Sequence, residues 1–182
     1  MRSLVIVTAG LSTPSTTRAL ADALSTATTA HLHARGDAAE VTVIELRELA
    51  AELALSMTDW LAPTPLLDTA KETLAAADGL IAVSPVFQGS YSGLFKMFFD
   101  TVDPHALDGL PTLIAATGGS NRHALVLDYA LRPLLNYLHA TVVPTGVYQA
   151  AEVGHPALAA RIKRASGELT DLMAARHMHS VL

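Results

Sequence analysis

Short apolar runs alternate with longer amphipathic segments along this chain, a pattern typical of strands alternating with helices. The apolar runs predict five strands, at residues 3–8, 40–46, 79–84, 111–117 and 141–147. The amphipathic segments predict helices at residues 15–34, 64–77, 90–102, 121–138 and 156–179, with a partly helical connection at 46–57. Alternation of this kind builds a parallel sheet covered by helices on both faces. We therefore expect a single doubly wound α/β domain over residues 1–182.

The usual right-handed connections favour the flavodoxin-like strand order 2-1-3-4-5. In this order the carboxyl ends of the first, third and fourth strands share the edge of the sheet where open α/β folds bind ligands. The loops that follow these strands, residues 10–18, 84–93 and 117–123, are rich in Gly, Ser and Pro and hold few charges. They favour a flat, mostly neutral ring held by backbone groups.

Composition narrows the class of protein. Hydrophobic residues make up 51% of the chain, yet no apolar run reaches the roughly 18 residues of a membrane span. The mean hydropathy of +0.35 is high, which predicts buried subunit interfaces. The absence of cysteine excludes thiol chemistry, disulfides and iron–sulfur clusters, and it fits a cytoplasmic location. The net charge of −5 argues against a nucleic-acid partner.

The loop after the first strand is dominated by hydroxyl side chains. Four hydroxyl residues and a cation stand at the start of the first helix: Ser12, Ser15, Thr16, Thr17 and Arg18. A helix amino end has unpaired N–H groups and a partial positive charge, so it attracts a phosphate. The alternative is an ordinary N-cap, which needs one hydroxyl only. Because the loop lacks both G-x-x-x-x-G-K-[ST] and G-x-G-x-x-G, it fits a phosphate monoester such as that of FMN.

The loop after the third strand offers apolar surface. Pro85 fixes the chain there, and Val86 and Phe87 stand beside backbone groups that suit the polar edge of a flavin. The alternatives are that Phe87 belongs to the core and that Ser92 only caps the next helix.

The loop after the fourth strand begins with Gly118 and Gly119, which permit close approach of the backbone to a ligand. The alternative is a plain tight turn. Backbone donors at residues 118–120 would stabilise the negative charge that a reduced flavin gains. His123 either lies beside the ring or is a surface residue.

Three segments resemble the NAD(P)H-dependent FMN reductase family. Residues 84–100, Ser-Pro-Val-Phe-Gln-Gly-Ser-Tyr-Ser-Gly-Leu-Phe-Lys-Met-Phe-Phe-Asp, resemble its signature Pro-x-(Tyr/Phe)-x-x-Ser-Tyr-Ser-Gly-x-x-Lys. Residues 116–120 and 127–133 are similar to the alkanesulfonate- and methanesulfonate-type reductases of two-component monooxygenase systems. The loop at residues 10–18 is close to their Gly-x-Ser-x-Pro-Ser-x-Thr-Arg. The resemblance covers about residues 3–147.

The resemblance implies reduction of FMN by NADPH or NADH, a transient FMN-dependent monooxygenase partner that takes the reduced FMN, and a homodimer or homotetramer. It implies phosphate contacts from Ser12, Ser15, Thr17 and Arg18. It implies flavin-ring contacts from Pro85, Val86, Phe87, Gln88, Gly118, Gly119 and Ser120. Phe87 stands where many members have Tyr. No catalytic side chain is expected, because hydride passes directly between stacked rings.

The predicted helix at 121–138 contains a proline. Pro133 cannot donate to the carbonyl of Tyr129, which costs up to ~3 kcal/mol unless the helix bends or widens. The alternatives are a proline kink and a π-bulge, and the resembled reductases have a π-helix here at a tetramer interface. The segment 124–138 is apolar nearly all round, which predicts burial at a subunit interface.

Two other functions stay open, a flavodoxin-like electron carrier that holds FMN and a quinone or azo reductase. Carriers tend to be strongly acidic with aromatic residues at the ring, and only 5% of this chain is aromatic. The pairs His31 with His33 and His177 with His179 predict no metal site, since residues two apart do not share a helix face. Trp60 is expected to anchor the segment before the second helix, or to line the flavin site of a neighbouring subunit.

Overall fold

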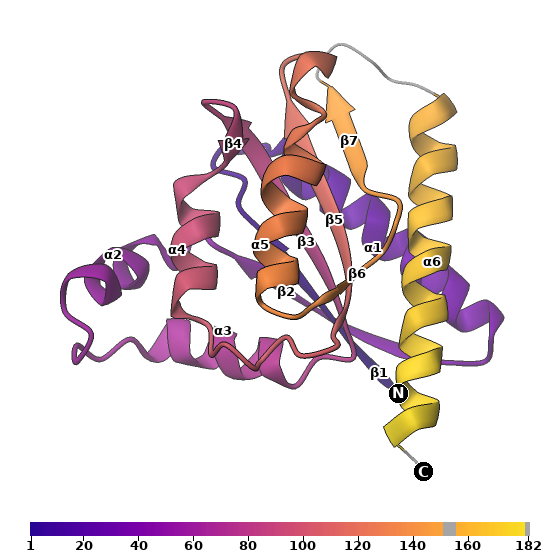
Figure 1. Ribbon diagram of the computed structural model, residues 1–182, viewed down its shortest axis with the longest axis horizontal. Coiled ribbons are helices and arrows are strands. Elements are labelled where there is room, and N and C mark those ends of the chain that lie inside the picture. The colour runs from indigo at the N-terminus through magenta and orange to yellow at the C-terminus, as the bar shows by residue number, and fades with distance from the viewer. Residues whose placement is uncertain (151–155, 181–182) are drawn as a thin grey trace.

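A parallel sheet forms the centre of the protein. The computed structural model describes residues 1–150 and 156–180, with side chains described for residues 1–150 and 157–176. The strands are β1 (Arg2–Thr8), β2 (Ala39–Glu45), β3 (Gly79–Phe87), β4 (Ser90–Tyr91), β5 (Pro111–Gly118), β6 (Thr141–Val142) and β7 (Val147–Ala150). Their order is β2-β1-β3-β5-β6, with β7 also beside β5 and β4 antiparallel to β3 (Figure 1). The flavodoxin-like α/β fold is confirmed, with differences in strand detail.

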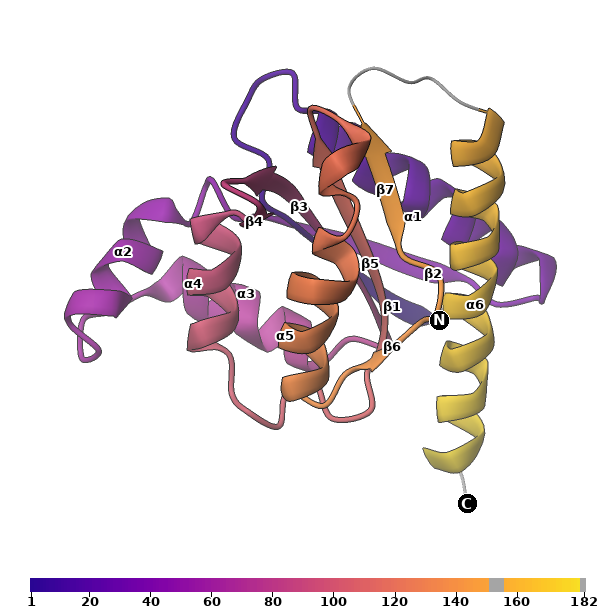
Figure 2. The ribbon, with the colours of Figure 1, turned by 45° about the horizontal axis from the view of Figure 1, so that its top comes forward.

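Two layers of helices cover the sheet. They are α1 (Thr16–Ala34), α2 (Ala50–Thr58), α3 (Pro65–Ala75), α4 (Gly93–Thr101), α5 (Arg132–Tyr137) and α6 (Pro156–Ser180). Alternate strand residues face opposite layers. Leu4 and Ile6 of β1 pack with α1 and α6, whereas Val5 and Val7 pack with α2, α3, α4 and α5. Figure 2 shows the same division.

The fifth strand differs from the prediction, which placed it at 141–147. It is two short strands, and both pair with β5. Pro144 has no N–H to donate to the ladder, so pairing stops after Val142 and resumes at Val147. The backbone N–H of Thr145, between the two strands, instead donates to the Glu168 carboxylate of α6 at 2.8 Å.

The helix predicted from residue 90 begins later, at Gly93. Ser90 and Tyr91 pair with Phe87 and Val86 in a hairpin that turns at Gln88 and Gly89. Both turn residues have positive φ, 48° and 79°, as a tight two-residue hairpin turn requires. Ser92 does cap α4, since its hydroxyl accepts the N–H of Phe95 at 3.2 Å.

The segment predicted as one helix at 121–138 has three parts. A 3-10 turn at Asn121–His123 precedes a π-helix at Leu127–Leu131, and α5 follows directly. The N–H of Arg132 donates to the carbonyl of Leu127, five residues back. Pro133 therefore falls in the first turn of α5, where a missing N–H costs little. Of the two alternatives, the structure shows the π-helix.

The expectation that Trp60 anchors the segment before α3 is wrong, because Trp60 is not packed against its own chain. Trp60 is 85% exposed, and Leu61 is 74% exposed. The short turn after α2 holds both residues away from the core. None of the helices among the described residues has the length and apolar character needed to cross a bilayer.

Candidate functional site

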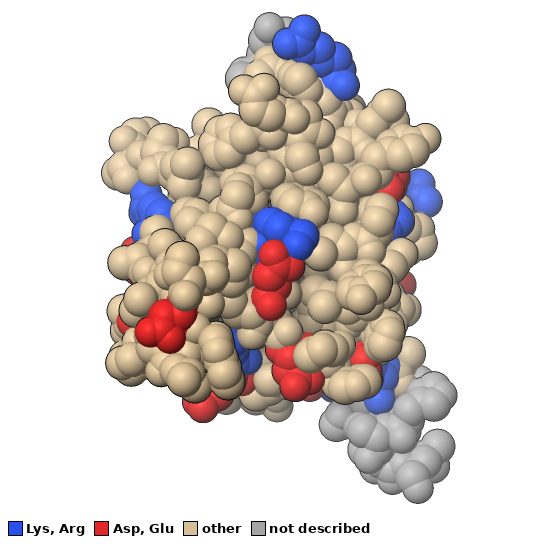
Figure 3. Space-filling model, turned by 60° about the vertical axis from the view of Figure 1, so that its left-hand side comes forward, with Lys and Arg blue, Asp and Glu red and all other residues tan. Residues whose placement is uncertain are grey.

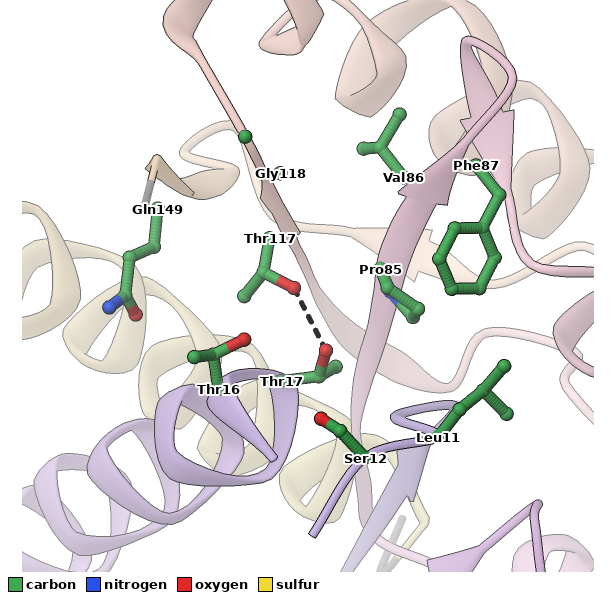
Figure 4. Close-up of a pocket in the computed structure, with 11 residues that line it drawn as sticks. Leu11, Ser12, Thr16, Thr17, Pro85, Val86, Phe87, Thr117, Gly118 and Gln149 are labelled. Atoms are coloured by element: carbon green, nitrogen blue, oxygen red, sulfur yellow. Dashed lines mark hydrogen bonds between the residues drawn. The ribbon is translucent and has the colours of Figure 1, made fainter. Parts of the chain in front are cut away.

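A pocket of about 460 Å³ opens at the carboxyl ends of β1, β3 and β5. The loops that form it come together at the upper edge of the sheet (Figure 2). Its lining residues are Leu11, Ser12, Thr16, Thr17, Pro85, Val86, Phe87, Thr117, Gly118, Gly119 and Gln149 (Figure 4). None of these eleven side chains carries a carboxylate, imidazole, amine or guanidinium group. The pocket is therefore built from hydroxyls, apolar surface, backbone and the carboxamide of Gln149.

The amino end of α1 forms one wall of the pocket. Ser15 is the N-cap, and its hydroxyl accepts the N–H of Arg18 at 3.1 Å. This bond uses Ser15 for the helix itself, as the simple capping alternative proposed. Ser12, Thr16 and Thr17 line the pocket beyond it. Ser15 therefore caps the helix, and Ser12, Thr16 and Thr17 line the pocket.

Thr17 and Thr117 join this wall to the floor of the pocket. Their hydroxyl oxygens lie 2.8 Å apart, and both residues are buried, at 3% and 6% exposed (Figure 4). The bond ties the first turn of α1 to the end of β5. Thr117 was not among the predicted contacts, because nothing in sequence pairs residues a hundred positions apart.

Arg18 does not line the pocket. Its guanidinium pairs with Asp22 at 2.7 Å and also with Glu45. The hydrogen bond to Asp22 is the main cause that raises the pKa of Arg18. The pairing of β1 with β2 brings Glu45 beside Thr8, which places this carboxylate behind the loop.

Arg47, which sequence reasoning missed, braces the same loop from outside. Its Nε lies 2.9 Å from the second oxygen of Glu45. Its Nη1 donates to the carbonyl of Ser12 at 3.1 Å and to the hydroxyl of Thr13 at 2.8 Å. The only signal in the sequence is a cation at the end of the second strand.

The β3 side of the pocket is apolar. Pro85, Val86 and Phe87 line it, and Phe87 is 45% exposed, so this ring is not a core residue. Gln88 is exposed in the hairpin turn and is not part of the lining.

The β5 side is held by Tyr148 of β7. Its hydroxyl donates to the carbonyl of Ser120 at 2.7 Å, and burial raises the pKa of this phenol. A Cβ on Gly118 would lie 2.3 Å from the Tyr148 hydroxyl, so the absence of a side chain there lets Tyr148 reach the loop. Gly119 lines the pocket, whereas Ser120 meets Tyr148 outside it. Gln149, the neighbour of Tyr148, completes the lining from a strand predicted to end at residue 147.

The fold and this pocket define a flavodoxin-like α/β protein with a ligand site at the carboxyl edge of its sheet. The family model described as NADPH-dependent FMN reductase matches residues 1–154. The chain belongs to the NADPH-dependent FMN reductase family, and it is an NAD(P)H:FMN oxidoreductase.

Individual relatives agree with this assignment. The NADH-dependent FMN reductase SfnE of Pseudomonas putida is 38% identical over 182 residues, which cover 96% of this chain and 94% of the relative. A solved oxidoreductase from Corynebacterium diphtheriae is 54% identical, with a TM-score of 0.92 over 96% of this chain and 98% of that one. The apo form of an NADH:FMN oxidoreductase, EMOB, is 30% identical, with a TM-score of 0.79 over 96% of this chain and 90% of that one.

Proposed function

We propose that the pocket holds FMN with its phosphate at the amino end of α1 and its ring between the loops after β3 and β5, and that the reduced flavin passes to a monooxygenase. One observation carries this proposal: the hydroxyl-rich amino end of α1 and the uncharged loops after β3 and β5 line the same pocket. When bound, FMN supplies the group that takes up hydride from the nicotinamide nucleotide.

The residues present fit a flavin. The cavity volume falls within the range of small-molecule sites. A Cβ built on Gly119 would meet no protein atom, so this position leaves room for a ring beside the backbone.

The phosphate end relies on backbone more than on free charge. The first N–H groups of α1 and the hydroxyls of Ser12 and Thr17 are the proposed donors. Ser15 acts through the cap that orients this turn. Arg18 is balanced by Asp22 and Glu45, so we assign it a supporting positive field and the task of holding the helix start.

The ring end orients the flavin and keeps polar side chains away from it. Pro85, Val86 and Phe87 offer an apolar surface, and the backbone of Gly118 and Gly119 lines the pocket as well. Gln88 and Ser120 do not line the pocket, so we assign them only a role in shaping the loops that hold the ring. Because no lining side chain is titratable, the protein supplies position and backbone dipoles, not a proton donor.

Two features support transfer of the reduced flavin. Leu11 and Phe87 at the pocket are 52% and 45% exposed, which leaves a bound flavin open to exchange. The resemblance of residues 10–18, 116–120 and 127–133 to reductases of two-component monooxygenase systems points to the class of acceptor.

We also propose that the protein is a homodimer or homotetramer. Leu125, just before the π-helix, and Tyr129 and Tyr137, on the π-helix and α5, are 64%, 79% and 82% exposed, a large apolar surface for one chain. A second copy would cover it.

The test is to mix purified protein with FMN and NADPH, then with NADH, and follow nucleotide oxidation without and with oxygen. Oxidation whose rate scales with added FMN supports a reductase that uses FMN as a substrate. Retention of a yellow chromophore with no oxidation by either donor would contradict the proposal and point to an electron carrier.

A further inference from the structure

Two histidines and an aspartate converge at the edge of the sheet opposite the pocket. His105 and Asp108 lie in the connection between α4 and β5, and His139 follows the end of α5. Nδ1 of His139 is 2.8 Å from Oδ1 of Asp108, and Nδ1 of His105 is 3.1 Å from Oδ2. All three possible ligand atoms lie within 4.8 Å of one another. Imidazole nitrogen and carboxylate oxygen are the donors that zinc-like dications take.

Main-chain hydrogen bonds place these donors. Asp108 donates its N–H to the carbonyl of His105 at 3.1 Å, which closes a turn between the two residues. Gly109, next to Asp108, donates to the carbonyl of His139 at 2.9 Å. Thr141 then donates to the carbonyl of Leu110 at 3.0 Å, where β6 joins β5. The two segments are therefore held together by backbone, independently of the side chains.

His139 occupies a position that favours glycine. It follows the end of α5 with φ of +64°, and its N–H donates to the carbonyl of Asn136 at 3.0 Å. The N–H of Ala140 donates to Leu135, also at 3.0 Å, which completes a Schellman motif. A left-handed conformation costs a non-glycine residue about 1 kcal/mol. Histidine is among the non-glycine residues that adopt this conformation more often than most, and here its imidazole reaches Asp108.

The charges around the three side chains favour a cation. Among the described residues, the Asp108 carboxylate forms ion pairs with these two histidines and with no lysine or arginine. Arg176 also reaches Asp108, but its guanidinium donates to the main-chain oxygen of Asp108 at 3.5 Å and not to the carboxylate. The His105, Asp108 and His139 side chains are 76%, 50% and 61% exposed, so an ion can reach them and the rings can adjust.

We propose that His105, Asp108 and His139 form a binding site for a zinc-like transition-metal dication, with water in the remaining positions. Bonds of about 2.0–2.2 Å to the ion require the three donors to move slightly apart from their present contacts. The ion links the connection before β5 to the end of α5. It stabilises the fold by mass action and leaves the pocket at the other edge untouched.

The test is a calorimetric titration of tag-free protein with ZnCl2, repeated with His105→Gln and His139→Gly, together with thermal unfolding with and without Zn²⁺. We expect one site in the parent protein and a rise in its melting temperature. Each variant should bind about 10-fold more weakly or worse, since lost supporting contacts alone have effects of that size. The matched control is His33→Gln, an exposed histidine on α1, which should bind as the parent does.

His139→Gly guards against a folding artefact, because glycine suits φ of +64° and the variant should unfold at the same or a higher temperature without metal. The absence of both binding heat and a thermal shift with Zn²⁺ would overturn the proposal. So would equal affinity in both variants and the parent, which would locate the ion elsewhere. FMN reduction should be the same in all of these proteins, so this test stands apart from that of the reductase function.

Discussion

Gly118 and Gly119 are adjacent, but their missing side chains serve different purposes. A side chain at Gly118 would collide with Tyr148, which holds the loop through Ser120. A side chain at Gly119 would meet no protein atom and would extend into space at the pocket. One glycine therefore preserves a contact within the protein, and the other preserves room for the proposed ligand.

We expect Gly119→Val to abolish FMN binding while the free energy of unfolding changes by no more than about 1 kcal/mol, because the new side chain fills only the pocket. Gly118→Ala is the matched comparison. It should lower stability by about 1 kcal/mol through loss of the Tyr148 hydrogen bond. Flavin fluorescence quenching and urea unfolding measure the two effects. Normal FMN binding by Gly119→Val would refute the proposed position of the ring.

The residues that sequence predicts best are those whose neighbours in the chain define them. Ser12 and Thr17 follow a strand and begin a helix, so their place at the pocket is predictable. Arg18 is predictable as a cation but not as the partner of Glu45, which the pairing of β1 with β2 brings alongside. Thr117 and Gln149 are contacts of tertiary origin, and no local pattern marks them.

The segment from Asn121 to Tyr137 shows what a sequence can and cannot predict about a helix. Pro133 indicates that a regular helix cannot continue unchanged. Whether the chain bends or widens depends on how Leu127 and Leu131 pack, and both are buried against the sheet. In the same way, Pro144 explains why the predicted fifth strand is interrupted. The sequence around it does not indicate that pairing with β5 resumes at Val147.

Helix α6 is tied to the link between β6 and β7 by Glu168. Its carboxylate accepts the N–H and the hydroxyl of Thr145 at 2.8 and 2.7 Å, and Arg164 lies 3.0 Å away. Burial raises the pKa of Glu168, but these hydrogen bonds outweigh it and keep the pKa below its ordinary value of 4.5. The stabilisation is therefore complete above pH 4.5 and is lost as the pH falls through the folded-state pKa.

We expect Glu168→Gln to lower the free energy of unfolding by about 1 kcal/mol at pH 7, because the carboxylate accepts bonds at both oxygens, whereas an amide has one accepting oxygen and an NH2 group that cannot accept. The difference between parent and variant should shrink as the pH drops below 4.5, because the unfolded parent then takes up a proton that the folded parent takes up only at lower pH. Urea unfolding followed by circular dichroism between pH 7 and pH 3 measures this. A difference that stays constant over this range would show that the charge of Glu168 does not contribute.

The protein presents a broad face with few charges. Figure 3 shows this face on the side of α2 and α4, where most of the surface is uncharged. The alternation of strands and helices made the fold predictable, because each apolar run has to be buried somewhere. The same reasoning does not say which exposed apolar residues another chain covers, since that depends on two surfaces at once.

If copies associate through the π-helix and α5, the double variant Tyr129→Glu with Tyr137→Glu should dissociate the oligomer. Two carboxylates in an apolar interface lose hydration that nothing replaces. Light scattering coupled to size-exclusion chromatography measures the mass. Ala30→Glu, at an exposed position of α1, is the control and should leave the mass unchanged. An unchanged mass for the double variant would place the interface elsewhere or show that the protein is a monomer.

Trp60 is the single tryptophan of the chain, and it is 85% exposed. Its emission should already be that of an indole in water when the chain is folded, so denaturation will change the spectrum little. A blue shift or quenching would instead report a molecule settling over the turn after α2. Intrinsic fluorescence of this protein is therefore a poor gauge of folding and a sensitive optical probe of what covers that surface.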